Sequence, residues 1–294
     1  MRIVKDSLWL FYLIAGVLAL FCFFPLWVTF VTSITSEDTI VTEGYSVLPK
    51  MFTLETYNYI ISNKGMMIWN AFRITLTVVL VGTLYSLFIT TCFAYATAQR
   101  KETFRLANAL SLFAWFTTIF SGGVLPWYIL TTRYYGLQNN IQALFIPSGM
   151  NVFFMFILRN NFKALPMELV ESAKIDGASN LRIFVTIAIP LTKVAMVTIT
   201  LFYALQYWND FYLSLYLISK TDLYPVQKLL YNMMANISAL LSNSNQADIL
   251  EHVTIPAYTA RMAMTMMTIL PVLAFYPFAQ KYFIRGITIG AVKG

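Results

Sequence analysis

Long apolar segments constrain this chain more than any other feature of its sequence. An α-helix needs about 20 mainly apolar residues to cross the hydrocarbon core of a bilayer. Six segments approach or exceed that length, and they cover roughly residues 8–31, 70–95, 107–130, 141–160, 193–217 and 262–283. Pro147, Gly149 and Asn151 interrupt the first half of the fourth segment. Because lipid offers backbone groups no hydrogen-bond partner, each segment is expected to cross as a helix, which predicts an all-α membrane protein with six transmembrane helices.

The composition excludes an ordinary soluble fold. Hydrophobic residues make up 59% of the 294 residues, charged residues make up 11%, and the mean hydropathy is +0.66. A soluble domain of this length has no interior large enough to hold so much apolar surface. The six segments occupy most of the chain and leave no room for a separate soluble catalytic domain. We therefore predict a single transmembrane domain, residues 1–294.

The distribution of basic residues predicts the orientation of the chain. Cytoplasmic loops of membrane proteins carry an excess of Lys and Arg. With the N-terminus inside, 13 of the 20 basic residues fall on the cytoplasmic side, namely Arg2, Lys5, Arg100, Lys101, Arg105, Arg159, Lys163, Lys174, Arg182, Lys193, Lys281, Arg285 and Lys293. Both termini are therefore predicted to be cytoplasmic. Membrane insertion accounts for the net charge of +7, so no nucleic acid partner is expected.

Two long segments are predicted to lie outside the membrane on the opposite side. Residues 32–69 are expected to be irregular apart from a short helix around Leu54–Ser62. Residues 219–258 are long enough to contact a soluble partner, and they contain His252, the only histidine. One histidine cannot supply the three or four protein ligands of a usual zinc site, so no metal site is predicted.

The polar stretch 161–193 is the only extended segment on the predicted cytoplasmic side. Pro166 suits the first turn of a short helix, because its missing N–H costs nothing there. Glu168 and Glu171 follow near the positive end of the helix dipole, and Asp176-Gly177 supplies a stop.

A second helix in this stretch is expected to begin near Ser179 or Asn180 and to end before Pro190. On the first helix, the apolar residues Leu169, Val170 and Ala173 are predicted to share one side and to form a ridge flanked by carboxylates. The ridge favours a docking role, and a solvated connector between two spans is the alternative.

Two groups of residues interrupt the apolar spans. Trp208, Asn209 and Asp210 place an acid inside the fifth span, where an ionisable group usually faces a cavity or a partner. These three residues are candidates to line a substrate path, and a structural hydrogen bond to a neighbouring helix is the alternative for Asp210. The other group is Gly122, Gly123 and Pro126 in the third span, which permit a kink that suits either a gate or close helix packing.

One pattern in the cytoplasmic stretch resembles a known signature. Glu171-Ser172-Ala173, then Gly177, then Ile187-x-Ile189-Pro190 is similar to the EAA signature of permease subunits of binding-protein-dependent ABC importers. Ser172 replaces an Ala of that signature and Ile189 replaces a Leu, and both changes conserve volume. Further likeness to the carbohydrate-uptake, maltose-type branch for larger oligosaccharides lies in Leu165–Leu169, Ile175–Ser179, Trp208–Asp210, Ser121–Gly123 with Pro126, and Tyr282–Gly286.

The resemblance implies a type I ABC importer permease fold in a bacterial plasma membrane. It also implies a second homologous permease, two copies of an ATP-binding subunit and an extracytoplasmic binding protein that delivers an oligosaccharide. The residues it assigns to coupling with the ATPase, on a cytoplasmic coupling helix, are Glu168, Glu171, Ser172, Ala173, Asp176, Gly177 and Pro190. ATP and magnesium would bind to the partner ATPase, and this chain would be non-catalytic, with no cofactor of its own.

Independent support comes from the motifs themselves. The chain has no G-x-x-x-x-G-K-[ST] phosphate cradle, so a pump built on it needs nucleotide bound by another polypeptide. Two other classes remain open from the residues alone. An ion-coupled secondary sugar carrier would use Asp210 as its relay, and it calls for broken helices in two repeats, for which the sequence gives no sign. An intramembrane enzyme would need a catalytic constellation, and none is found.

Overall fold

The structure is a computed structural model, which describes residues 2–242 and 256–291. His252 lies outside these residues, and the side chains of Tyr282–Gly286 are not described. The chain divides into two compact units. Unit 1 comprises Met1–Trp69 and Leu229–Ala274, and unit 2 comprises Asn70–Lys228 and Phe275–Gly294.

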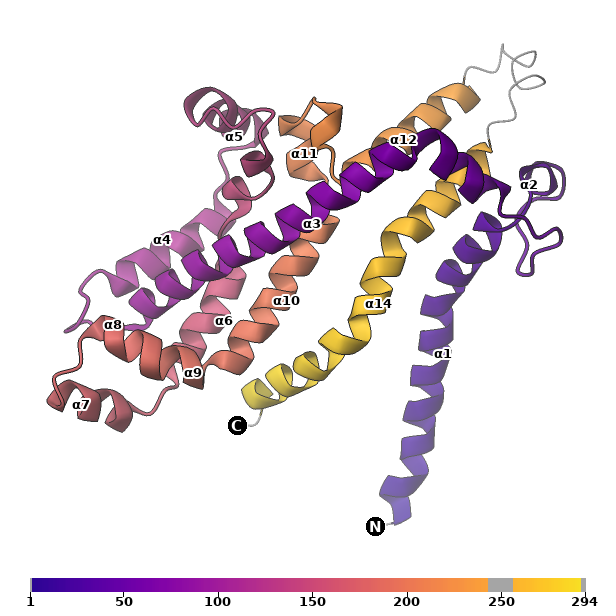
Figure 1. Cartoon of the computed structure of the whole chain (residues 1–294). Helices are drawn as coiled ribbons and strands as arrows, with labels where there is room; N and C mark the ends of the chain where they lie inside the picture. Colours follow the sequence, from indigo (N-terminus) through magenta and orange to yellow (C-terminus); the bar gives the residue numbers. More distant parts are fainter. Residues whose placement is uncertain (1, 243–255, 292–294) are drawn as a thin grey trace. The chain divides into compact units, whose positions relative to one another are not determined.

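Helices form all the regular elements of the described residues (Figure 1). The first half of the chain contains α1 (Arg2–Ser33), α2 (Glu37–Glu43), α3 (Glu55–Ala98), α4 (Ala107–Ile119), α5 (Val124–Ile129), the π-helical η1 (Leu130–Tyr134) and two 3-10 turns, η2 (Ile141–Leu144) and η3 (Ile146–Ser148). The second half contains α6 (Val152–Lys163), α7 (Met167–Ile175), α8 (Asn180–Ile183), the π-helical η4 (Phe184–Ala188), α9 (Ile189–Leu191), α10 (Lys193–Asn209), α11 (Tyr212–Leu217), the 3-10 turn η5 (Thr221–Leu223), α12 (Val226–Ser242) and α14 (Ala257–Ala291).

Three helical stretches in the described residues are individually long and apolar enough to cross a membrane, namely Trp9–Ser33, Glu55–Ala98 and Ala257–Pro277. Three further pairs of shorter stretches satisfy the same criterion together, but each pair is bent. The bends are 115° between Ala107–Ile119 and Val124–Tyr134, 54° between Ile141–Ser148 and Val152–Lys163, and 80° between Asn180–Leu191 and Lys193–Asn209. The number of crossings therefore reaches six only if each bent pair is one crossing, and the six-span count stays a prediction.

Several predicted boundaries differ from the structure. The short helix expected around Leu54–Ser62 is the first part of α3, because no proline separates it from the following apolar segment. The expected span 107–130 is broken after Ile119, and 193–217 is broken after Asn209. In 141–160, which Pro147 and Gly149 interrupt, the chain forms 3-10 turns as far as Ser148, and the α-helix starts only at Val152.

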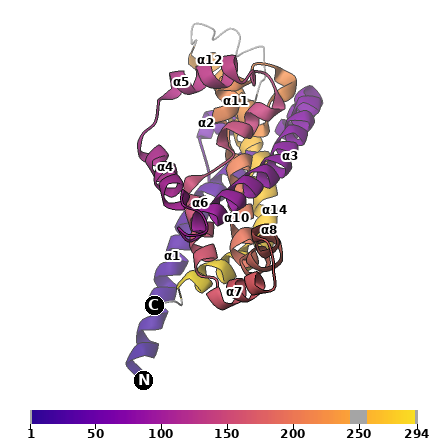
Figure 2. The same ribbon diagram turned by 90° about the vertical axis from the view of Figure 1, so that its left-hand side faces the viewer.

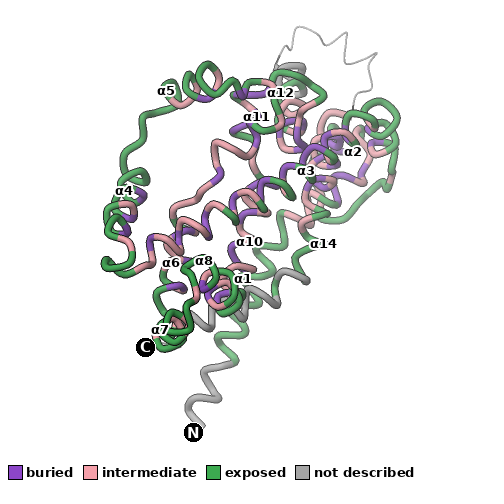
Figure 3. Tube along the Cα trace, turned by 60° about the vertical axis from the view of Figure 1, so that its left-hand side comes forward, coloured by how far each residue is buried: buried purple, intermediate pink, exposed green. Residues whose placement is uncertain are grey.

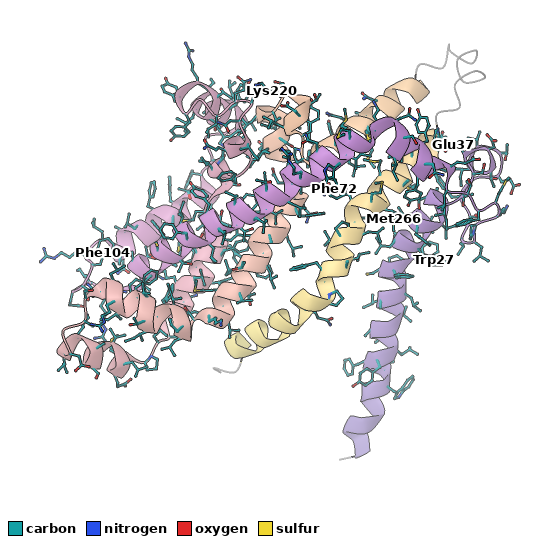
Figure 4. The ribbon with its side chains drawn as sticks, viewed as in Figure 1. Trp27, Glu37, Phe72, Phe104, Lys220 and Met266 are labelled. Atoms are coloured by element: carbon teal, nitrogen blue, oxygen red, sulfur yellow. The ribbon has the colours of Figure 1, made fainter. Side chains whose placement is uncertain are left out.

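Unit 1 is organised by hydrogen bonds to the N-terminus of α14. The carboxylate of Glu37 on α2 accepts from the backbone N–H groups of Tyr258 and Thr259, at 2.8 Å each, and from the Thr259 hydroxyl at 2.7 Å. Figure 4 labels Glu37 beside the start of α14. A carboxylate suits this place because the first N–H groups of a helix lack partners inside it and carry partial positive charge. By contrast, the apolar side chains of α1 between Trp9 and Phe24 are exposed (Figure 3).

Unit 2 has an apolar core that joins α3, α6 and α10. Two tyrosines of α10 bond to hydroxyls of α3, since Tyr203 pairs with Thr90 at 2.5 Å and Tyr207 pairs with Ser86 at 2.6 Å. The Tyr203 hydroxyl also accepts from the backbone N–H of Asn151 at 2.9 Å. These hydroxyls are buried, so each bond satisfies groups that water cannot reach.

Close approach on α3 depends on one glycine. A Cβ at Gly82 would lie 2.9 Å from the Phe145 Cβ and 3.0 Å from the ring of Tyr207. Only a residue without a side chain permits this contact, so Gly82 fixes how closely α10 and the segment before α6 pack on α3.

Candidate functional site

The turn between α7 and α8 is built entirely by local hydrogen bonds. Beyond the last residue of α7, the N–H of Ala178 donates to the Ala173 carbonyl at 2.9 Å, and the N–H of Gly177 donates to the Lys174 carbonyl at 3.0 Å. This is the Schellman pattern, which requires the left-handed conformation that Gly177 adopts with φ +75°. The Ser179 hydroxyl then accepts from the Arg182 N–H at 3.2 Å and caps α8. The predicted stop at Asp176-Gly177 and the predicted start of the second helix are both confirmed.

Pro190 lies inside the helical stretch, whereas the sequence predicted a helix end before it. The π-helical segment η4 precedes it, and within that segment the N–H of Ile189 donates five residues back to the Phe184 carbonyl. A π turn is wider than an α turn, which gives the proline ring room against the preceding turn. The helix therefore continues through Pro190 to Leu191 and bends by 80° into α10 at Thr192.

The inner side of α7 covers a cavity of about 450 Å³ in unit 2. Met167, Val170 and Lys174 of α7 line it, opposite the end of α3 and the end of α6. The predicted apolar ridge of Leu169, Val170 and Ala173 is therefore wrong in part. Val170 faces this cavity and Ala173 is half-buried, whereas Leu169 is exposed.

The outer side of the α7–α8 region presents apolar side chains to solvent. Ile175 is 86% exposed, and Leu169 and Leu181 are exposed as well. The other residues predicted to couple to an ATPase, Glu168, Glu171, Ser172, Asp176 and Gly177, are exposed around them, as is Pro190. Leu169, Ile175 and Leu181 are therefore candidates for a surface that binds a partner.

Glu171 has a partner within the chain. Its carboxylate lies 3.7 Å from a guanidinium nitrogen of Arg100, which follows the end of α3, and both side chains are 60% exposed. An exposed ion pair of this kind contributes only about 0.2–1 kcal/mol, so another charge can displace either member.

The candidate gate residues form a break between two helices. After α4 the backbone of residues 120–123 is not helical, Gly123 has φ +86°, and α5 starts at Val124 with Pro126 in its first turn. The predicted kink is thus a full break with a change of direction of 115°. Figures 1 and 2 show α5 and α11 at one end of unit 2 and α7 at the other.

A groove of about 530 Å³ opens at this break. Its walls are residues 121–124, Pro126, Trp127 and Leu130 on one side and Tyr212 of α11 on the other. The rings of Trp127 and Tyr212 have centroids 5.7 Å apart, and Tyr216 lies 6.2 Å from Trp127. These three aromatic residues belong to no recognised motif, although the spacing of Tyr212 and Tyr216 by four residues on a helix already puts them on one face.

The three candidate path residues at the end of α10 are placed differently from one another. Trp208 is only 9% exposed and packs against Phe72 of α3, which Figure 4 labels, with ring centroids 6.4 Å apart. The amide nitrogen of Asn209 donates to the Leu205 carbonyl at 2.9 Å, and the Asp210 carboxylate accepts from the Leu213 N–H at 3.3 Å. Asp210 lies between α10 and α11, two residues before α11 begins, and its carboxylate is held by the first turn of α11. This hydrogen bond joins neighbouring residues of one chain segment.

Metal chemistry finds no support in the described part of the chain, where no group of three or more His, Cys, Asp or Glu residues is arranged to hold an ion.

Comparisons with known proteins identify the class. No family model matches the chain. It is 36% identical over 262 residues to protein LplC of Bacillus subtilis strain 168, and the match covers 89% of this chain and 86% of LplC. It is 34% identical over 279 residues to the polygalacturonan/rhamnogalacturonan transport system permease protein YtcP of the same strain, and this match covers 94% of each chain.

A solved structure agrees with these relatives. A chain in the crystal structure of a bacterial ABC transporter involved in the import of the acidic polysaccharide alginate superposes with a TM-score of 0.81 at 28% identity, covering 96% of this chain and 98% of that chain. The fold and the relatives define a membrane-embedded transport subunit. The chain belongs to the carbohydrate-uptake permeases of ABC transporters, and the resemblance seen in its sequence is confirmed.

Proposed function

We infer that this chain forms half of the translocation pathway of an ATP-driven importer for an oligosaccharide. A second, homologous permease supplies the other half, two copies of an ATP-binding subunit bind ATP and magnesium, and an extracytoplasmic binding protein delivers the sugar. Both termini lie in the cytoplasm of a bacterial cell. The family supports this assembly. The oligosaccharide cargo is supported by the names of relatives, which include polygalacturonan for YtcP and arabinooligosaccharides for AraQ of Bacillus subtilis.

The surface of the α7–α8 region carries the proposal. Leu169 and Ile175 are exposed on α7, which lies outside every candidate span, and Leu181 is exposed at the start of the bent pair that begins at Asn180. We propose that all three lie outside the lipid. A cleft on the ATPase subunit would bury them, and at roughly 25 cal/mol per Å² of apolar surface even a few side chains give a useful docking energy. The exposed carboxylates of Glu168 and Glu171 would select basic groups on that cleft.

The geometry suits the transfer of force from α7 to α10. The Schellman turn and the Ser179 cap hold α7 against α8, and the helix continues through η4 and α9 to the bend at Thr192. The Thr192 hydroxyl donates to the Ala188 carbonyl at 2.8 Å, and this hydrogen bond stabilises the bend. A displacement of α7 by the ATPase would thus reach α10 and, through Tyr203 and Tyr207, also α3.

The other candidate roles follow from the positions of the residues. Gly122, Gly123 and Pro126 are proposed to let the segment between α4 and α5 change direction during transport, because the backbone of residues 120–123 is not helical. Asn209 is exposed and remains a path candidate, whereas the burial of Trp208 favours a packing role for that ring. We do not propose the ion-coupled carrier, because the relatives are ABC transporter permeases and the Asp210 carboxylate serves as a cap for α11.

Substitution of the exposed apolar residues tests the coupling. In the complex reconstituted with its ATPase, second permease and binding protein, Ile175→Ser and Leu169→Ser should both lower ATP hydrolysis stimulated by the sugar-loaded binding protein. Leu106→Ser is the matched control, because Leu106 is also exposed on the predicted cytoplasmic side but belongs to the loop before α4. Equal activity of all three variants and the wild type would contradict docking at this surface.

A further inference from the structure

The groove at the break between α4 and α5 has a feature that lipid contact does not explain. Residues 120–123 have non-helical backbone inside the predicted third span, and Ser121, Gly122 and Gly123 are exposed. In a bilayer, irregular backbone is tolerated only where protein buries it or where it lines a water-filled cavity, since lipid cannot satisfy its polar groups. The groove therefore faces an aqueous space, a polar occupant or a partner protein, and the chemistry of its walls favours a polar occupant.

The chemistry of the groove walls fits a sugar. Trp127 is half-buried, and Tyr212 and Tyr216 are 41% and 39% exposed, so parts of all three rings are open. The ring planes of Trp127 and Tyr212 meet at 41°, and those of Trp127 and Tyr216 meet at 87°. Tyr216 packs against both other rings, with its centroid 4.8 Å from that of Tyr212, and only Trp127 and Tyr212 line the groove. The open parts of these two rings can contact the apolar face of a carbohydrate.

Polar groups stand beside the rings. Ser121 accepts a hydrogen bond from the Gly123 N–H at 3.1 Å, which leaves its own hydroxyl proton to be donated. The Tyr212 phenol is a second donor and acceptor for sugar hydroxyls. The groove volume of about 530 Å³ lies within the range of small-molecule sites, roughly 300–1,000 Å³, and no charged residue lines it.

Both walls are held in place before any ligand binds. On α11, Leu213, Ser214 and Leu217 are buried, and the Asn139 N–H donates to the Leu217 carbonyl at 2.9 Å. On the opposite wall the hydroxyl of the buried Thr131 donates to the Trp127 carbonyl at 2.8 Å. A preformed site loses less entropy when it binds a ligand than one that must be ordered.

We propose that this groove is a carbohydrate-binding subsite of the translocation pathway, in which Trp127 and Tyr212 contact a sugar ring and Ser121 binds its hydroxyls. The subsite rests on the proposed import function. Because its lining is neutral, it recognises the ring and the hydroxyls of a sugar residue rather than a carboxylate, and it accepts neutral and acidic oligosaccharides alike.

Cysteine protection tests occupancy of the groove. Gly122→Cys and Leu125→Cys are made separately in a Cys22→Ala, Cys92→Ala background of the whole complex with its binding protein. A Cβ at Gly122 meets only Pro126, at 3.9 Å, so this cysteine fits the groove floor without a clash. Leu125 is exposed on α5, three residues after Gly122, and it does not line the groove, which makes it the matched control. The probes are an oligogalacturonide and an arabino-oligosaccharide, each tested for stimulation of ATP hydrolysis.

The probe that stimulates ATP hydrolysis should slow the reaction of the Gly122→Cys variant with a small water-soluble thiol reagent about fivefold or more, and it should leave the Leu125→Cys variant unchanged. Equal rates at Gly122→Cys with and without that probe would overturn the subsite. No labelling in either condition would mean that the second permease covers the groove, and it would overturn the subsite too. If neither probe nor any other oligosaccharide stimulates the wild-type complex, the proposed function itself fails.

Ring substitutions test the stacking contact by another route. Trp127→Phe keeps a flat ring and should retain uptake within about twofold, whereas Trp127→Ala should lower uptake roughly fivefold to tenfold, the range expected for one aromatic contact. Leu125→Ala is the control and should transport like the wild type. Equal uptake by the Phe and Ala variants would overturn stacking at Trp127.

Discussion

Substitution of Gly177 isolates the contribution of the α7–α8 turn. Gly177 has φ +75°, and a Cβ built on it meets nothing within 4 Å. Gly177→Ala therefore creates no clash, and its whole effect is the cost of the left-handed conformation, about 1–2 kcal/mol for a residue with a Cβ. Asn adopts this conformation more readily than other non-glycine residues, so Gly177→Asn should cost less than Gly177→Ala.

This cost has a defined consequence for docking. The Schellman turn orients the exposed Ile175 relative to Leu181, so a destabilised turn lowers the population that fits the ATPase. A cost of about 1–2 kcal/mol lowers the equilibrium constant for forming the turn roughly 5- to 30-fold, and this factor is the upper limit of the loss in apparent affinity. The assay is titration of the purified ATPase subunit onto the two permeases in nanodiscs. The affinity should be highest for the wild type, lower for Gly177→Asn and lowest for Gly177→Ala. Wild-type affinity of Gly177→Ala, or an Asn variant weaker than the Ala variant, would refute the reasoning.

Three further predictions concern stability, each measured as the thermal unfolding midpoint of the purified complex. Gly82→Ala should lower this midpoint, because the new methyl group meets the Phe145 Cβ at 2.9 Å and overpacking costs about 1–3 kcal/mol. The control Gly65→Ala should not lower the midpoint, since the nearest neighbour of its new Cβ is 3.7 Å away. Tyr203→Phe should cost about 1–3 kcal/mol because it leaves its buried hydrogen-bond partners unpaired, and an unchanged midpoint would contradict that bond. Glu37→Gln should destabilise the start of α14 by removing a charge that accepts three hydrogen bonds, and an equal or higher midpoint would speak against this cap.

The local structure of residues 161–193 was predictable because short-range rules govern it. Gly177 needs a left-handed turn and Ser179 caps a helix, whatever lies around them. The family was predictable for a related reason, since its signature lies in the same stretch.

Side-chain direction and helix breaks were less accessible to sequence reasoning. Leu169 and Val170 are adjacent and therefore lie about 100° apart around α7, so Leu169 is exposed while Val170 faces the inner cavity at the ends of α3 and α6. Pro190 predicted a helix end, yet the π turn before it removes the steric reason for one. Both outcomes depend on tertiary packing and on hydrogen-bond register, which a sequence pattern does not carry.

The aromatic groove also depends on tertiary structure that the sequence pattern does not carry. Gly122 and Gly123 predicted a weak point in a helix, but the direction of the 115° turn decides which residues face the break. That turn brings Trp127 to Tyr212, 85 residues further along the chain. Trp208, by contrast, drew attention as a ring beside an acid, and its contact with Phe72 shows that it is part of the packing between α10 and α3.

The central claim is that the α7–α8 surface docks into the ATPase subunit. It is tested most directly by Ile175→Cys in a cysteine-free background, with disulfide cross-linking to single cysteines around the cleft of the ATPase in inverted membrane vesicles. The account predicts a cross-link at Ile175→Cys, none at the control Leu106→Cys, and a change in cross-linking when ATP binds. Modification of Ile175→Cys by a membrane-impermeant reagent from the extracytoplasmic side, or the absence of a cross-link to every cleft position, would contradict it.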